Sequence, residues 1–154
     1  MDASFVMTSR WWLDADPQRV WPLVGDCRHW PRWLQSMQEQ REALHWRMPW
    51  PWASSFEVQD GQCAMPHHQD QWLIGPVRVR CDALVETQPV DRVAVTLRLQ
   101  LSLDRPWLRH TAPSLLPWVA RQHFIAMQQS VPRLGELLNC PVSLPSRWAG
   151  YRAR

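Results

Sequence analysis

The stretch that decides the fold is WWLDADPQRVWPLVGDCRHWPRWLQ, residues 11–35. It overlaps a half-buried strand predicted over residues 4–13, where apolar and polar side chains alternate. Asp16 suits a helix N-cap and Pro17 the first helical position, where the missing N–H costs nothing. Gly25-Asp26 should end this helix, and a second short helix is expected over residues 28–34. This order, two short helices directly after a first strand, limits the choice of fold.

The middle of the chain predicts strands and turns. Residues 40–47 form one candidate strand, and the loop over 48–52 follows because two prolines so close together do not belong in a central strand. The Asp-Gly pair within residues 59–61 predicts a hairpin turn between strands over 54–58 and 63–74.

The clearest strand pattern comes next. Residues 77–85 alternate between small apolar and charged side chains, and residues 93–103 place Val and Leu on one side against Thr, Arg, Gln and Ser on the other. Such alternation is typical of an antiparallel sheet that is covered on one face only.

The last third of the chain predicts a helix over residues 107–139. Pro113 and Pro117 should break its first part, which leaves 118–138 as the long piece, and Pro132 should kink that piece. Apolar side chains recur along it at spacings of three and four, with one histidine among them, so one stripe should cover the sheet: Val119, His123, Met127, Val131, Leu134 and Leu138.

The composition is that of a globular chain with an unusual share of tryptophan. Of the 154 residues 12 are Trp, and because a buried indole N–H needs a partner we expect many of these rings at pocket walls. The length fits one domain, which we place over residues 1–140. Residues 141–154 contain two more prolines and few apolar side chains, and are expected to be an irregular extension.

The charge and the cysteine pattern limit the binding partners and the cellular location that we expect for the protein. The formal net charge is +3, and the 17 basic residues are all Arg, scattered among acids, so we expect no nucleic-acid partner. The four cysteines form no C-x-x-C pair, and the opening residues lack a secretory pattern, which favours reduced thiols and a cytoplasmic location. No stretch approaches 18 apolar residues, so no membrane span is expected. The protein should be a monomer or a dimer.

Two motifs, one near each end, carry a family resemblance. The first is Trp11-x-Leu13-x-Ala15, then Val20-Trp21, then Gly25-Asp26-x-x-x-Trp30-Pro31-x-Trp33. The second is Pro106-Trp107-Leu108-Arg109, leading into a helix that carries His123 and Met127 and ends Leu134-x-x-Leu137-Leu138. Over residues 4–139 the chain resembles the START-like (SRPBCC) superfamily, in particular its polyketide cyclase/dehydrase-like branch. It departs from the family in the loop over 48–52, in Asp-Pro where Ala-Pro is usual, and at Pro132.

The resemblance implies an α+β helix-grip fold. In this fold a curved antiparallel sheet, here of six to seven strands, wraps around the long C-terminal helix and leaves a cavity for a hydrophobic or aromatic small molecule. Known members bind lipids, sterols, polyketides or plant hormones, and some cyclise or dehydrate their ligand; the fold alone does not choose among these. The residues expected to contact a ligand are Trp11, Trp46, Phe56, Trp72, Val79, Cys81, Leu97, Leu99, His123 and Met127.

His123 is the candidate catalytic group. A neutral imidazole that faces an apolar cavity can hydrogen-bond a ligand, or act as an acid or base near neutral pH. The alternative is that His123 and the other candidate ligand residues simply fill a packed core.

Three functions follow from these patterns. The first is binding of a hydrophobic small molecule, such as a lipid or polyketide. The second is a cyclase or dehydratase without nucleotide or metal cofactor, which would need at least two convergent groups, such as His123 with Thr96 or Asp70. The third is an interaction protein that uses surface Trp and Arg side chains, which would require several indoles exposed on one side.

Two further clusters suggest other chemistry. One has the spacing of a nucleophile site but is more simply a helix junction capped by its aspartate: Asp26, Cys27 and His29. The other contains metal-ligating side chains: Cys63, His67, His68 and Asp70. Adjacent strand residues point to opposite faces, so the two histidines do not readily serve one ion. No nucleotide-binding or hydrolase motif is present. We therefore expect no cofactor and no metal.

Overall fold

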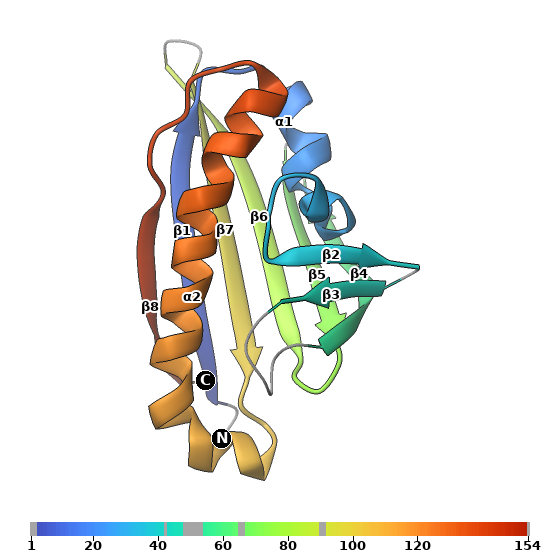
Figure 1. The fold of residues 1–154 in the computed structure, drawn as a ribbon. Helices are drawn as coiled ribbons and strands as arrows, with labels where there is room; N and C mark the ends of the chain where they lie inside the picture. The colour runs from blue at the N-terminus through green and yellow to red at the C-terminus, as the bar shows by residue number, and fades with distance from the viewer. Residues whose placement is uncertain (1–2, 42, 48–53, 65–66, 90–91, 154) are drawn as a thin grey trace.

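The structure is an eight-stranded antiparallel sheet that curls around one long helix (Figure 1). It is a computed structural model and describes residues 3–41, 43–47, 54–64, 67–89 and 92–153. The elements are β1 (Ala3–Leu13), α1 (Pro17–Val24), the 3-10 helix η1 (Cys27–Arg32), β2 (Met37–Gln40), β3 (Ala43–Trp46), β4 (Ser54–Ala64), β5 (His68–Ile74), β6 (Val79–Gln88), β7 (Arg92–Ser102), α2 (Pro106–Leu138) and β8 (Ser146–Ala153). The predicted α+β class, with a long C-terminal helix and short helices after the first strand, is confirmed.

The strand order is β2-β3-β4-β5-β6-β7-β1-β8, so β1, the first strand in the sequence, lies between β7 and β8, the last two. Figure 1 shows α2 running along β1 and β7 on one face of the sheet, while β2 and β3 run crosswise to the long strands. On β7 and β1 the side chains of alternate residues point to the helix side, as expected for strands with one covered face. The predicted loop over 48–52 lies outside the described residues.

The two short helices form where the sequence predicts them. The Asp16 carboxylate accepts a hydrogen bond from the Gln18 backbone N–H at 2.9 Å and so caps α1. The Asp26 carboxylate does the same for η1, accepting from the Arg28 N–H at 3.0 Å. The η1 indole of Trp30 donates to a carbonyl oxygen of α1, which ties the two helices together.

The long helix follows its predicted stripe but not its predicted breaks. Every member of the stripe is buried, from Val119 to Leu138. The helix is nevertheless continuous from Pro106 to Leu138, so the prediction that Pro113 and Pro117 break it is wrong. Both prolines lie on exposed positions of the helix, where carbonyls that lose their partner remain accessible to water. The helix also continues through Pro132.

The predicted hairpin turn at residues 59–61 is also wrong. Strand β4 runs straight through these residues to Ala64, and its pairing with β5 shifts register between Asp60 and Cys63. Gly61 is needed here for space, because a Cβ atom would lie 2.8 Å from the Asp70 carbonyl oxygen. The Asp-Gly pair therefore marks a close approach of two strands.

The C-terminal extension is not irregular over its second half. Residues 146–153 form β8, which pairs antiparallel with β1 and raises the strand count to eight, above the six to seven predicted. The strand lies at the edge of the sheet and is mostly exposed, so its stability comes from main-chain pairing rather than apolar burial. One aromatic contact adds to this: the rings of Phe5 and Tyr151 are 5.3 Å apart, edge to face.

Hydrogen bonds join the second half of helix α2 to α1 and to the segment that follows η1. The Ser130 hydroxyl accepts a hydrogen bond from the Gln35 backbone N–H at 3.0 Å, and Arg19 donates to the Leu138 carbonyl at 3.1 Å. Among the described residues, no helix is both long and apolar enough to span a membrane.

Candidate functional site

Most of the predicted ligand residues lie together between the sheet and α2. All of these are buried, and the rings of Trp46 and Phe56 are 6.1 Å apart. The buried members are Trp11, Trp46, Phe56, Val79, Cys81, Leu97, Leu99, His123 and Met127.

Trp72 does not join them. It lies beside Arg80 in the β5–β6 pairing, while its neighbour Leu73 is fully buried, so Trp72 points to the outer face of the sheet. There the Arg78 guanidinium lies 5.0 Å from the indole centroid, a cation–π contact. The prediction that Trp72 faces the helix is therefore wrong.

His123 belongs to this buried group and comes from α2. It is 2% exposed, and its ring meets the Trp46 indole edge to face at 6.3 Å. The Nδ1 atom of His123 has no hydrogen-bond partner among the described residues. Burial lowers the pKa of His123 to about 4, so the imidazole is neutral at neutral pH.

Other buried polar groups beside the helix also lack partners. The indole N–H groups of Trp11 and Trp46 have none within the described ranges, nor does the hydroxyl of Ser9, which is 1% exposed. By contrast, the buried indoles of Trp30 and Trp33 donate to backbone carbonyls at 2.8 Å. A buried polar group without a partner costs about 1–3 kcal/mol, so these atoms are places where a ligand or a water molecule would be stabilised.

A hollow of about 180 Å³ opens between β1, α2 and the linker that leads into β8. Its lining residues are Ser9, Phe124, Met127, Gln128, Leu144, Pro145, Ser146 and Arg147. Met127 is the one predicted ligand residue among them. The sequence contains a signal for Ser9, because the alternation along β1 places this polar residue on the strand face that is otherwise apolar. Phe124 follows His123 directly. The linker residues carry no local pattern that marks a site.

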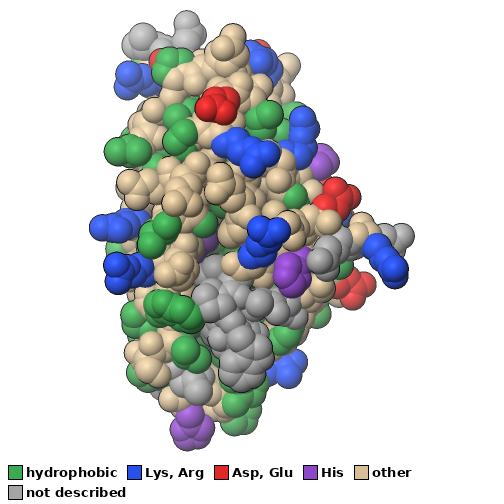
Figure 2. Space-filling view, viewed as in Figure 1, with side chains coloured by type: hydrophobic (Ala, Val, Ile, Leu, Met, Phe, Trp, Pro, Cys, Tyr) green, Lys and Arg blue, Asp and Glu red, His purple; other side chains and the backbone are tan. Residues whose placement is uncertain are grey.

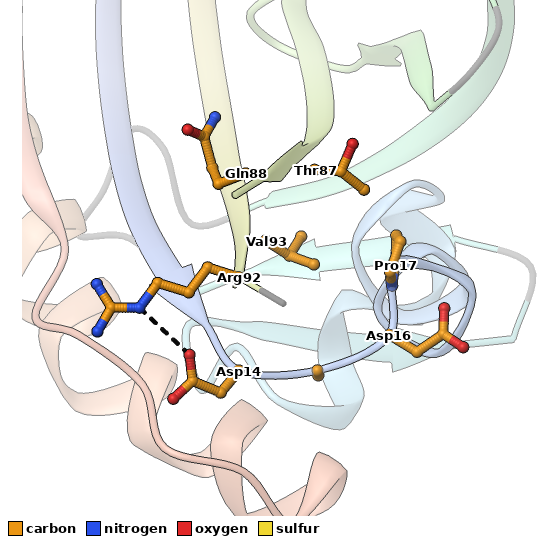
Figure 3. Close-up of a pocket in the computed structure, with 8 residues that line it drawn as sticks. Asp14, Asp16, Pro17, Thr87, Gln88, Arg92 and Val93 are labelled. Carbon is orange, nitrogen blue, oxygen red and sulfur yellow. Dashed lines mark ion pairs between the residues drawn. The ribbon is translucent and has the colours of Figure 1, made fainter. Parts of the chain in front are cut away.

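A larger hollow of about 530 Å³ lies at the other end of β1, between the loop before α1 and the end of the β6–β7 pair (Figure 3). Figure 3 shows Arg92 reaching across to Asp14, with 3.4 Å between Nε and Oδ1. Asp16 at its rim already caps α1. Asp14, Asp16 and Arg92, charged residues that line this hollow, therefore already have partners in the loop and at the start of α1.

The cluster around Cys27 is a helix junction. The Asp26 carboxylate accepts hydrogen bonds from the Arg28 N–H and from the Gln71 side chain, and the His29 imidazole donates to the Pro22 carbonyl at 2.6 Å. Cys27 is fully buried, and burial, with a smaller contribution from the Asp26 charge, raises the pKa of its thiol to about 12. A thiol held protonated in this way is a poor nucleophile.

The two adjacent histidines have different neighbours: His68 is the first residue of β5, and His67 lies in the turn before it. The ring of His67 lies 5.2 Å from the Trp21 ring, whereas His68 Nε2 lies 3.7 Å from an Asp82 oxygen. Among the described residues, no group of three His, Cys, Asp or Glu side chains could hold a metal ion.

Comparisons with known proteins assign no relative to the chain: no family model, no curated protein and no solved structure matches it. The curled antiparallel sheet with a long C-terminal helix packed on it is consistent with a helix-grip-like fold, and this likeness is one of architecture.

Proposed function

We propose that this protein binds a small, largely apolar molecule between the sheet and α2, entering at the hollow beside Met127. The observation that carries the proposal is Ser9: it is one of the residues that line this hollow, and its buried hydroxyl has no partner among the described residues. Sites for small molecules combine apolar walls with a few polar groups that fix orientation. Phe124 and Leu144 supply such walls.

The size of the hollow limits the ligand. A cavity of about 150 Å³ lined by apolar side chains holds benzene, so a hollow of about 180 Å³ suits a molecule with one ring or a short alkyl chain. A longer ligand, such as a lipid or polyketide, would have to displace side chains towards His123 and Trp46, whose unpartnered N and N–H groups lie deeper in the same interior.

Binding is favoured over catalysis by the state of His123. A general acid or base works best with a pKa near the operating pH, whereas burial lowers that of His123 to about 4. Within the described part of the chain, no hydrogen bond or ion pair links His123 to a second titratable group. Thr96 and Asp70, its candidate partners, lie on the outer face of the sheet, where Asp70 pairs with Arg80 at 2.7 Å.

The test uses a neutral probe, 3-phenylpropanamide, and protein with ¹³C-labelled methionine methyl groups. Binding should shift the Met127 methyl signal, which is assigned through its loss in Met127→Leu. Phe124→Ala removes an apolar wall of the hollow and should weaken binding by about tenfold. Ile125→Ala, a change at the next and exposed residue, should leave binding unchanged. Saturation of the protein without movement of the Met127 signal would exclude this site.

A second candidate function is interaction through surface indoles. Trp12 and Trp148 are 38% and 56% exposed and share the outer face of the sheet, and the Arg10 guanidinium lies 5.5 Å from the Trp12 ring. Exposed Trp and Arg side chains are enriched at protein interfaces. Sedimentation of the protein over a range of concentrations, compared with Trp148→Ser, tests whether this face joins two copies.

A further inference from the structure

We propose that the ligand of the hollow beside Met127 carries an anionic head group, a carboxylate, which Arg147 and Ser9 hold on the β1–β8 side of the hollow while the apolar part lies against Met127 and Phe124. This inference rests on the proposed function and adds the chemical class of the ligand.

The pairing of β1 with β8 brings the two anchoring side chains together. Ser9 and Arg147 are direct partners in this antiparallel register, so both side chains leave the sheet on the helix side. Side chains directly opposite one another in such a pair have Cβ atoms about 4.5–5.5 Å apart. One ligand head group is therefore within reach of both the Ser9 hydroxyl and the Arg147 guanidinium, and both residues line the same hollow.

The charge around the hollow has one sign. None of its lining residues is acidic, and α2 contributes only Phe124, Met127 and Gln128. Arg147 makes no ion pair within the described part of the chain, whereas several other arginines do, such as Arg92 with Asp14. Figure 2 shows basic and hydrophobic side chains gathered along the margin of the molecule that carries β8. Arg147 beside the apolar side chains of Met127 and Phe124 suits an amphiphilic ligand with an anionic head group.

Both anchors suit a carboxylate. The guanidinium has a planar set of donors that fits the two carboxylate oxygens, and the Ser9 hydroxyl has a proton to donate and no described acceptor for it. Because Arg147 is exposed, solvent screens its charge, and the expected gain from the head group is a moderate one of about five- to tenfold in affinity.

The experiment compares 3-phenylpropanoate with its isosteric neutral amide, 3-phenylpropanamide. Both are titrated by calorimetry at low ionic strength, and the Met127 methyl signal reports whether each one occupies the hollow. We expect the carboxylate to bind about five- to tenfold more tightly than the amide, and this preference to shrink as salt is added. In Arg147→Gln most of this preference should be lost.

The matched control is Arg152→Gln. Arg152 belongs to the same strand and carries the same charge, but it pairs with Ser4 on the outer face, so this variant should keep the preference for the carboxylate. Ser9→Ala should reduce the preference without unfolding the protein, because its hydroxyl has no described partner to lose.

The outcomes separate the two proposals. Equal binding of both probes with a shifted Met127 signal, or a preference that Arg152→Gln removes and Arg147→Gln keeps, would overturn the anionic head group while the apolar site stands. If neither probe moves the Met127 signal, the site itself is wrong and the head-group inference falls with it.

Discussion

Replacing His123 with Leu should flatten the pH dependence of folding stability between about pH 7 and pH 5. In the folded protein, burial lowers the pKa of this imidazole from 6.5 to about 4. As the pH falls below 6.5, the unfolded chain binds a proton at His123 while the folded protein does not. The unfolded state then binds more protons, so the free energy of unfolding falls with falling pH.

The size of this effect follows from the two pKa values of His123. The difference between 6.5 and about 4 corresponds to about 3 kcal/mol, all of it lost once the pH is well below 4. About 2 kcal/mol of it is already lost at pH 5. For a domain with a typical stability of about 5–15 kcal/mol, this loss is readily measured.

The assay is urea unfolding, followed by tryptophan fluorescence, of the natural protein and of His123→Leu at several pH values between 7.5 and 5. The remaining five of the six histidines, and all carboxylates, are present in both proteins, so their contributions cancel in the difference between the two free energies. That difference should change by about 2 kcal/mol towards pH 5, in favour of the variant. A difference that stays constant with pH would mean that His123 is not held neutral in the interior, and the reasoning about the buried polar groups would fail.

Two further predictions concern residues outside the site. At pH 8 a thiol reagent such as DTNB should modify the exposed Cys63 in the native protein but not Cys27. The Cys27 thiol is fully buried and has a pKa of about 12, so it stays protonated. Rapid modification of Cys27 before unfolding would contradict its burial. Gly61→Ala should lower the free energy of unfolding by about 1–3 kcal/mol, because its Cβ would press on the Asp70 backbone, whereas Gly150→Ala meets only a mostly exposed ring and should cost less in the same urea titration.

The periodic elements were predictable from the sequence because burial repeats along them. The stripe from Val119 to Leu138 and the alternation over 93–103 each place apolar side chains on one face, and the structure buries those faces. The caps at Asp16 and Asp26 were predictable for a different reason, since the side chain and the N–H that it accepts from lie two residues apart.

The failures come from features that local pattern does not encode. The prediction for Trp72 fails because a shift of one residue moves every side chain of a strand to the other face, and the size of an indole does not reveal which face is covered. The Asp-Gly pair predicts a turn at Gly61 because this pair favours turns, whereas the glycine is needed for space beside the Asp70 backbone of the neighbouring strand.

Strand β8 and the missed site residues have one common cause. Arg147 and Ser9 come from opposite ends of the chain, and only the pairing of β8 with β1 makes them neighbours. A strand that is mostly exposed shows little apolar alternation, so the sequence predicts an irregular tail where the structure has an edge strand. The same tail closes one side of the hollow through Leu144 and Pro145. The sequence can therefore predict that a helix covers this sheet, but the rim of the space between them depends on a long-range pairing that only the folded chain reveals.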